Sequence, residues 1–245
     1  MQLNEDIELI DGMPAVFIRS LNSVVISDPH LGYEGVKAEQ GMLIPKVNLM
    51  HLLKMLDACI RKTGADRLII DGDIKNEFST VDAEELNELI DLLQFVKERG
   101  TRLTIVKGNH DNFVERYKES FKLEIYAQEF ADNGYLFFHG EKLPGKSRKT
   151  KFMIMGHEHP AIAVFNGAGR REKLRCFLYG TALGVKLLVL PASNYFASGT
   201  EINLYPKEEL LSPMLKKINV DKLEAIAIGY GSTINFGKIK DLRQI

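Results

Sequence analysis

Histidine, aspartate and asparagine side chains recur in five short clusters along the chain, and their chemistry is that of a metal site. The members with metal-binding side chains are Asp28, His30, Asp73, Asn109, His110, His139, His157 and His159. Together they offer imidazole, carboxylate and amide donors and no thiolate. Such donors suit Mn, Fe or Zn, and they argue against a structural zinc site made from cysteine.

The number of donors indicates more than one ion. Seven of these side chains, all except His110, exceed what one tetrahedral ion can use, whereas two adjacent divalent ions that share a carboxylate would use them all. Two such ions carry about +4, Asp28 and Asp73 return about −2, and a bound hydroxide leaves roughly +1, which favours an anionic substrate such as a phosphate ester. His110 is then an extra imidazole, suited either to stabilise charge developing at phosphorus or to protonate the leaving oxygen.

The clusters must be positioned by the elements that precede them. Each follows a short apolar run with the pattern of a buried strand, and the five runs cover residues 23–27, 67–70, 103–106, 135–138 and 152–155. Apolar residues at helical spacing predict helices over 47–62 and 82–99, so the first part of the chain has a βαβ pattern. In an open α/β sheet the loops at the carboxyl ends of strands converge on one crevice. We therefore expect the five clusters to meet.

The remaining elements are an opening β-hairpin over residues 7–18, a strand-rich part after residue 174, and one short helix over 206–217 that begins at its proline. The 245 residues are 45% hydrophobic and 27% charged, which is typical of a soluble globular protein and excludes disorder, a fibrous repeat and a disulfide scaffold. Cys59 and Cys176 are expected to be buried thiols in a reducing compartment. The acidic N-terminus and the shortness of the longest apolar stretch predict no signal peptide and no membrane span. We expect one domain over 1–245 in the cytoplasm.

With the clusters in order, the sequence resembles a known family. Asp28-Pro29-His30, Gly72-Asp73, Gly108-Asn109-His110-Asp111, His139-Gly140 and Gly156-His157-Glu158-His159 resemble the five signature blocks of the calcineurin-like metallophosphoesterases. The blocks span more than half of the chain. The resemblance implies a four-layer αββα sandwich, in which two mixed β-sheets are flanked by helices.

The resemblance also implies roles for the residues. Asp28, His30 and His159 would hold one divalent ion, Asn109, His139 and His157 the other, and Asp73 would bridge the two. The ions would be Mn, with Fe, Zn, Ni or Co as alternatives. His110 would be the catalytic imidazole, and Asp111 would either orient His110 or cap the helical turn that follows. The implied function is a phosphoesterase that hydrolyses a phosphomonoester or phosphodiester by attack of a metal-bound hydroxide.

Within the family the chain looks most like compact archaeal-type phosphoesterases related to repair nucleases of the SbcD type. Asn76 stands where the nuclease branch commonly has a histidine, three residues after Asp73, and we expect it to face the substrate. A DNA-contacting cap domain is not expected, because the residues after His159 have the strand pattern of a second sheet. The alternatives are a nuclease acting on DNA or RNA, a non-catalytic binding scaffold of the same fold, and a protein phosphatase. Scaffolds of this fold typically lose the third-block histidine, which is present here as His110.

Three further segments have open interpretations. Basic residues within 142–175, the group Lys146, Arg148, Lys149, Lys151, Arg170, Arg171, Lys173 and Arg175, would either follow a nucleic-acid backbone or lie in a solvated loop. Residues 191–200 form either a loop in which Asn194 or Ser198 touches substrate, or a simple turn. His51 is expected to be an ordinary helix residue, and Glu158 to face solvent or an ion-pair partner. The sequence does not define an oligomeric state.

Overall fold

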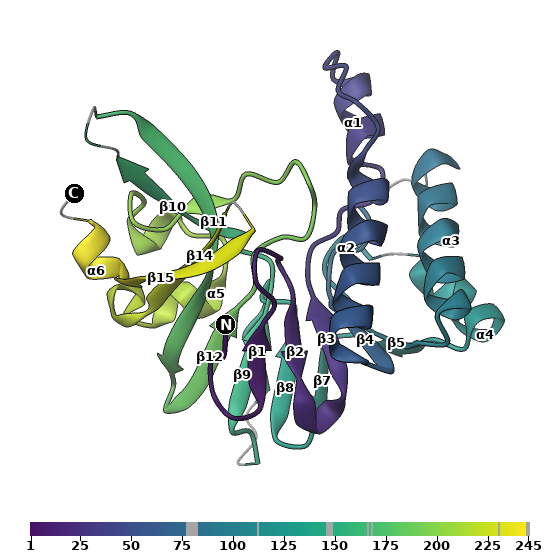
Figure 1. Cartoon of the computed structure of the whole chain (residues 1–245), viewed down its shortest axis with the longest axis horizontal. Coiled ribbons are helices and arrows are strands. Elements are labelled where there is room, and N and C mark those ends of the chain that lie inside the picture. Colours follow the sequence, from purple (N-terminus) through teal and green to yellow (C-terminus); the bar gives the residue numbers. More distant parts are fainter. Residues whose placement is uncertain are drawn as a thin grey trace.

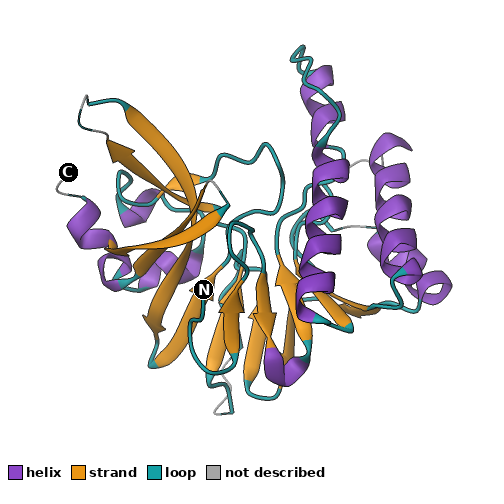
Figure 2. Cartoon of the chain, viewed as in Figure 1, coloured by secondary structure: helices purple, strands orange, loops and turns teal. Residues whose placement is uncertain are grey.

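Two β-sheets pack face to face, and helices cover the outer side of each (Figures 1 and 2). The computed structural model describes residues 1–76, 83–111, 113–145, 149–165, 167, 169–229 and 231–243. In Figure 1, α2 (Asn48–Thr63) and α3 (Ala83–Glu98) lie on one side of the molecule, and α5 (Pro213–Lys217) and α6 (Ile239–Leu242) lie on the other. Among the described residues, no helix is long and apolar enough to span a membrane.

The first sheet has the strand order β1-β2-β3-β4-β5-β6. Its strands are β1 (Ile7–Leu9), β2 (Val16–Ile18), β3 (Ser23–Ile26), β4 (Arg67–Asp71), β5 (Arg102–Val106) and β6 (Glu124–Tyr126). The hairpin β1–β2 and the pair β2–β3 are antiparallel, whereas β3 to β6 run parallel. The short helices α1 (Tyr33–Glu39) and α4 (Lys118–Phe121) belong to this half. The predicted hairpin and βαβ pattern are confirmed.

The second sheet has the order β13-β10-β11-β12-β9-β8-β7, and β14 and β15 extend from β11. Its strands are β7 (Glu129–Asp132), β8 (Tyr135–Phe138), β9 (Phe152–Met155), β10 (Pro160–Phe165), β11 (Arg171–Ala182), β12 (Val185–Val189), β13 (Thr200–Glu201), β14 (Glu224–Gly229) and β15 (Ser232–Lys238). The strands β8, β9 and β12 are parallel, and β10 and β11 form an antiparallel hairpin. Both sheets are therefore mixed, as predicted.

Alternation along the strands assigns side chains to three apolar cores. In β3, Val24 and Ile26 pack in the core that contains α2 and α3, while Val25 points into the core between the sheets. In β9, Met153 packs with residues of α5 and α6, while Ile154 faces the core between the sheets. Successive side chains on a strand point to opposite faces, so strands buried on both faces define the αββα layers that the family resemblance implied.

The expectation of one helix over 206–217 is wrong. A single 3₁₀ turn covers Lys207–Glu209, Leu210 is extended with φ −63° and ψ 156°, and α5 begins at Pro213. The backbone NH groups of Leu211 and Ser212 both donate to the Glu158 carboxylate, so they do not form the hydrogen bonds that a continuous helix would need. Ser212 then caps α5 by accepting from the NH of Met214.

Candidate metal centre

The loops after five strands converge at one edge of the two sheets, where they place two groups of potential ligands. The first group is Asp28, His30 and His159, and the second is Asp73, His139 and His157. Within each group the ligand atoms all lie within 4.8 Å of one another. The loops after β3 and β4 supply the aspartates and His30, and the loops after β8 and β9 supply the other histidines. Each group therefore combines side chains from both sheets.

The donor atoms approach one another as ligands of a common cation do. Asp28 Oδ1 and His30 Nε2 each lie 3.2 Å from His159 Nε2. In the second group, His139 Nε2 lies 3.1 Å from Asp73 Oδ2 and 3.2 Å from His157 Nδ1. Imidazole and carboxylate donors at such short separations suit a divalent first-row metal.

Asn109 supplies an independent test of the fit. Its side-chain Oδ1 is buried and has no hydrogen-bond partner among the described residues. A buried amide oxygen without a partner is unfavourable in a folded protein unless another group satisfies it. A cation would satisfy this oxygen, so the residues present fit a metal centre.

Five of the candidate ligands have left-handed backbone geometry. Their φ values are 52° for Asp28, 45° for His30, 46° for Asp73, 68° for His157 and 48° for His159. Non-glycine residues rarely adopt this region, and clusters of them are typical of functional sites. These left-handed residues lie in the loops that bring the ligands of the two groups together.

The glycines of the signature blocks leave space for the ligands. A Cβ on Gly72 would lie 2.0 Å from His139 Nδ1, and one on Gly108 would lie 2.2 Å from Asp73 Oδ1. A Cβ on Gly156 would lie 2.6 Å from Asp28 Oδ2. Any side chain at these three positions would displace a ligand, so the position of each ligand depends on the glycine beside it.

The pKa values of the histidines are shifted in opposite directions. Burial, followed by the positive neighbour His159, lowers the pKa of His30 to about 4, and burial with His139 lowers the pKa of His157 to about 4. Both rings are therefore neutral at pH 7, which is the form that binds metals. Burial alone would lower the pKa of His139 as well, but the hydrogen bond to Asp73 and the charge of Asp28 raise it to about 10.

His110 lies beside the second group and is the more accessible imidazole. Its Nε2 is 3.8 Å from Asp73 Oδ2, and 27% of its side chain is exposed, whereas the His139 side chain is fully buried. Its backbone NH donates to Asp73 Oδ1, and its Nδ1 lies 2.7 Å from the carbonyl oxygen of Asn76. Asn76 thus contacts His110 through its backbone.

Asp111 holds the loop that carries Asp73. Its buried carboxylate accepts hydrogen bonds from the backbone NH groups of Ile74, Lys75 and Gly108. The expectation that Asp111 caps the following helical turn is wrong, because the N-cap of that turn is Phe113 and it makes no side-chain cap bond. The carbonyl of Asn76 orients the His110 ring instead. Asp111 therefore has the contacts of a positioning residue.

Two asparagines together hold the other ligand loop: Asn48, which the sequence did not single out, and Asn194, which was expected to contact substrate or lie in a simple turn. The amide groups of Asn48 and Asn194 each donate to the carbonyl oxygens of Pro29 and His30. The Asn194 side chain is fully buried, so it secures the loop and does not face substrate. Glu158 is also buried and binds the backbone near α5, which contradicts the expectation of an exposed or ion-paired side chain.

The basic residues within 142–175 divide into different environments. Arg171 pairs with Glu201, and the Arg175 guanidinium donates to the carbonyls of Ala192 and Asn194. These two arginines therefore support local structure. Lys146 and Arg148 lie outside the described residues.

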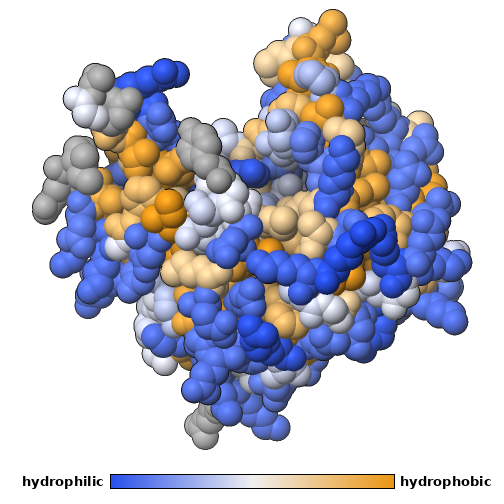
Figure 3. All heavy atoms as spheres, in the orientation of Figure 1, coloured by the Kyte–Doolittle hydropathy of each residue, from blue (hydrophilic) through white to orange (hydrophobic). Residues whose placement is uncertain are grey.

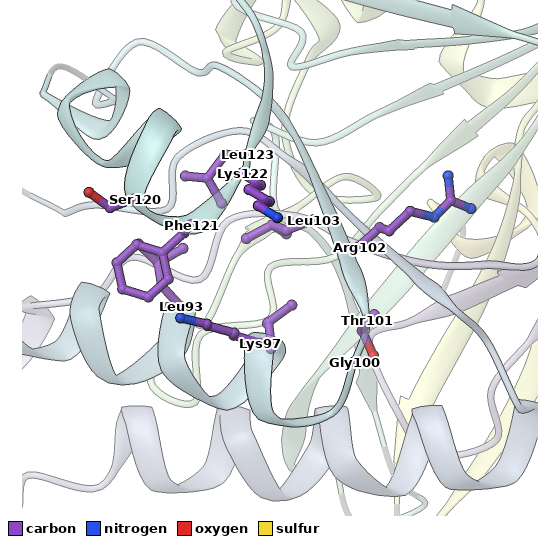
Figure 4. A pocket seen from close by; sticks show the side chains of 11 residues that line it. Leu93, Lys97, Gly100, Thr101, Arg102, Leu103, Ser120, Phe121, Lys122 and Leu123 are labelled. Carbon is purple, nitrogen blue, oxygen red and sulfur yellow. The ribbon is translucent and has the colours of Figure 1, made fainter.

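A separate cavity of about 560 Å³ lies at the start of β5, remote in the chain from the ligand loops (Figure 4). Its lining includes Leu93 and Lys97 of α3, Arg102 of β5 and Phe121 of α4. Because Arg102 is at the amino end of β5 and Asn109 follows its carboxyl end, the cavity and the ligand cluster lie at opposite ends of this strand.

The geometry defines an αββα protein with two candidate metal-binding groups, and the comparisons identify its family. Residues 21–172 match the family model described as calcineurin-like phosphoesterase, so the chain belongs to that family. Nuclease MPE from Pseudomonas putida is similar in structure, with a TM-score of 0.63 and 18% sequence identity over 93% of this chain and 94% of that one. The phosphoesterase Yfce from E. coli gives a TM-score of 0.45 and 17% identity over 88% and 98% of the two chains. A search of curated proteins gave no match. At 18% identity the likeness to nuclease MPE concerns the fold.

Proposed function

We propose that this protein is a phosphoesterase with two divalent metal ions, which hydrolyses phosphomonoesters or phosphodiesters. The observation that carries the proposal is the meeting of the two ligand groups, with His110 at their exposed side. Mn is the expected metal, and Fe, Zn, Ni and Co fit the same donors. The ions, when bound, supply Lewis acidity for the phosphoryl oxygens and an activated water.

Asp28, His30 and His159 would hold one ion, and His139, His157 and Asn109 would hold the other. Asp73 is the candidate bridging ligand. Its Oδ2 lies 3.1 Å from His139 Nε2, and its Oδ1 accepts from the backbone NH of His110. A carboxylate has two oxygens with which to contact two ions, a capacity that a single imidazole nitrogen lacks.

His110 is placed to handle a proton. Because Nδ1 lies 2.7 Å from the Asn76 carbonyl oxygen, the NH of that nitrogen donates there, and Nε2, 3.8 Å from Asp73 Oδ2, is the nitrogen on the side of the ligand groups. A proton on Nε2 would stabilise negative charge at the phosphoryl group or pass to the leaving oxygen. Asp111 and Asn76 act in this proposal as positioning residues, since both act through the backbone or the loop geometry.

Hydrolysis of p-nitrophenyl phosphate and bis-p-nitrophenyl phosphate tests the proposal. The purified protein should turn over at least one of the two esters with Mn²⁺, Ni²⁺, Co²⁺ or Zn²⁺. His110→Ala should lower kcat by about 10²- to 10⁴-fold, the usual contribution of a general acid or charge stabiliser. Absence of turnover with all four metals would overturn the enzymatic proposal and favour a non-catalytic scaffold.

Metal analysis tests the ligand assignment separately. Asp73→Asn should lose bound metal, whereas His110→Ala should retain it, because His110 is outside both ligand groups. Equal metal content in Asp73→Asn and the wild-type protein would refute the bridging assignment. Matched thermal unfolding curves for the variants would exclude a general folding defect.

A further inference from the structure

Four aromatic rings form a continuous cluster next to the candidate metal centre. They belong to Tyr33, His51, Tyr195 and Phe196, which we call the aromatic cluster. His51 and Tyr195 stack with ring centroids 4.0 Å apart and planes 10° apart. Phe196 lies edge-to-face with Tyr195 at 5.1 Å and stacks on Tyr33 at 5.9 Å with planes 12° apart.

The cluster is fixed to a metal-ligand loop by hydrogen bonds. Asn48, three residues before His51 on α2, donates to the His30 carbonyl and accepts from the backbone NH of Tyr195. Asn194 donates to the same carbonyl and, through Oδ1, accepts from the NH of Phe196. In Figure 1, the segment after β12 reaches across towards α1 and α2. The backbone that carries Tyr195 and Phe196 is therefore tied to the loop of His30.

Chain geometry bounds the distance from the rings to the ligands. Tyr33 follows His30 by three residues, so their Cα atoms lie within about 11 Å. Tyr195 directly follows Asn194, whose side chain contacts the His30 carbonyl. The aromatic cluster thus borders the site where a phosphate would bind.

These rings are not part of an apolar core, and Tyr195 is the exposed member. None of the four belongs to the three apolar cores found among the described residues. Tyr195 is 49% exposed, and the other three are half-buried. His51 covers one face of Tyr195, yet Tyr195 remains 49% exposed, so a further planar group can reach this ring from solvent. Met42 and Leu43, in the segment between α1 and α2, are also exposed. Figure 3 shows an apolar projection at the top of the molecule.

We propose that the aromatic cluster binds an unpaired nucleobase of a single-stranded nucleic acid, whose phosphodiester lies at the metal centre. This inference rests on the proposed phosphoesterase function. A nucleobase has the planar π-face that stacks on aromatic side chains, and stacking tolerates any base sequence. Base faces inside a duplex are covered by their neighbours, so the stack selects unpaired strands. Recognition would come from the aromatic cluster.

Calorimetric titration of the Mn²⁺-loaded full-length His110→Ala protein tests the proposal without turnover. The probes are a short single-stranded DNA of mixed sequence, an abasic strand of the same length and the corresponding duplex. The base-containing single strand should bind about tenfold more tightly than the abasic strand, and Tyr195→Ala should remove this difference. Tyr195→Phe should retain it because the π-face is kept.

A matched control keeps the result specific. Tyr205 is 43% exposed and lies outside the aromatic cluster, so Tyr205→Ala should leave the preference unchanged. Metal content equal to wild type in Tyr195→Ala would exclude damage to the ligand loop. Equal binding of base-containing and abasic strands, stronger duplex binding, or no binding of any strand would overturn the proposal. Because binding is measured, failure here is distinct from failure to hydrolyse small esters.

Discussion

Replacing Gly72 by alanine isolates the steric contribution of a signature glycine to the metal centre. Gly72 has φ +85°, and a Cβ there would lie 2.0 Å from His139 Nδ1 and 2.4 Å from His139 Cγ. The His139 ring is fully buried, so it has no free space into which to move. We expect Gly72→Ala to combine backbone strain with displacement of a ligand.

Gly64 provides the matched control, because it has φ +69° and no atom within 4 Å of an added Cβ. Left-handed geometry costs a non-glycine residue about 1–2 kcal/mol, so Gly64→Ala should lower the free energy of unfolding by that amount. Gly72→Ala adds the cost of overpacking, about 1–3 kcal/mol, for a total of about 2–5 kcal/mol. In a chain of this size 1 kcal/mol corresponds to about 2–4 °C in Tm.

Urea unfolding at fixed metal concentration gives the two free energies, and elemental analysis of the folded proteins gives the metal content. Gly64→Ala should keep its metal, whereas Gly72→Ala should lose part of it because His139 can no longer occupy its place. Equal destabilisation by the two substitutions, together with equal metal content, would refute the steric reasoning.

Three other predictions concern the surroundings of the centre. Lys75 and Glu85 form a buried ion pair at 2.7 Å. Lys75→Met or Glu85→Leu alone should lower the free energy of unfolding in urea by about 3–5 kcal/mol, and the double variant should lower it by less. A loss in the double variant equal to the sum of the two single losses would contradict this. Burial raises the pKa of Glu88 from 4.5 to about 7, so the folded state holds this proton more tightly than the unfolded state. The resulting stability is present below about pH 4.5 and is lost as pH rises through 7; Glu88→Gln should flatten the decline in Tm between pH 5 and pH 8, and an unchanged decline would count against it. Chelation of the metal should lower the Tm, because metal at a concentration of 100 Kd contributes about 2.7 kcal/mol to the free energy of unfolding. The Tm of Asp73→Asn should not respond to chelation. An equal response in both proteins would refute linkage through this site.

The strand-end clusters could be predicted because their signals are local. Apolar runs such as 67–70 and 103–106 end at polar residues, and parallel strands bring such ends together. The two ligand groups of the structure contain six of the seven metal ligands expected from the sequence. The seventh, Asn109, has the unpartnered buried oxygen described above. The spacing of donors therefore carried most of the information about the site.

The supporting contacts could not be predicted because they join residues far apart in the chain. Asn48 meets Tyr195 across 147 positions, and Asn194 meets His30 across 164. No local pattern distinguishes these asparagines from ordinary polar residues. Glu158 likewise receives NH groups from residues more than fifty positions away, and this long-range contact replaces the expected continuous helix over 206–217 with two short turns.

The division of each ligand group between the two sheets has a consequence for how the chain assembles. Asp28, His30 and Asp73 emerge early during synthesis, but their partners His139, His157 and His159 follow much later in the chain. Neither half of the fold holds a complete group. Under the proposed metal binding, a complete ligand group therefore requires the loops after β3 and β4 to be docked against those after β8 and β9. A complete ligand group therefore forms only when both sheets have folded and packed against each other.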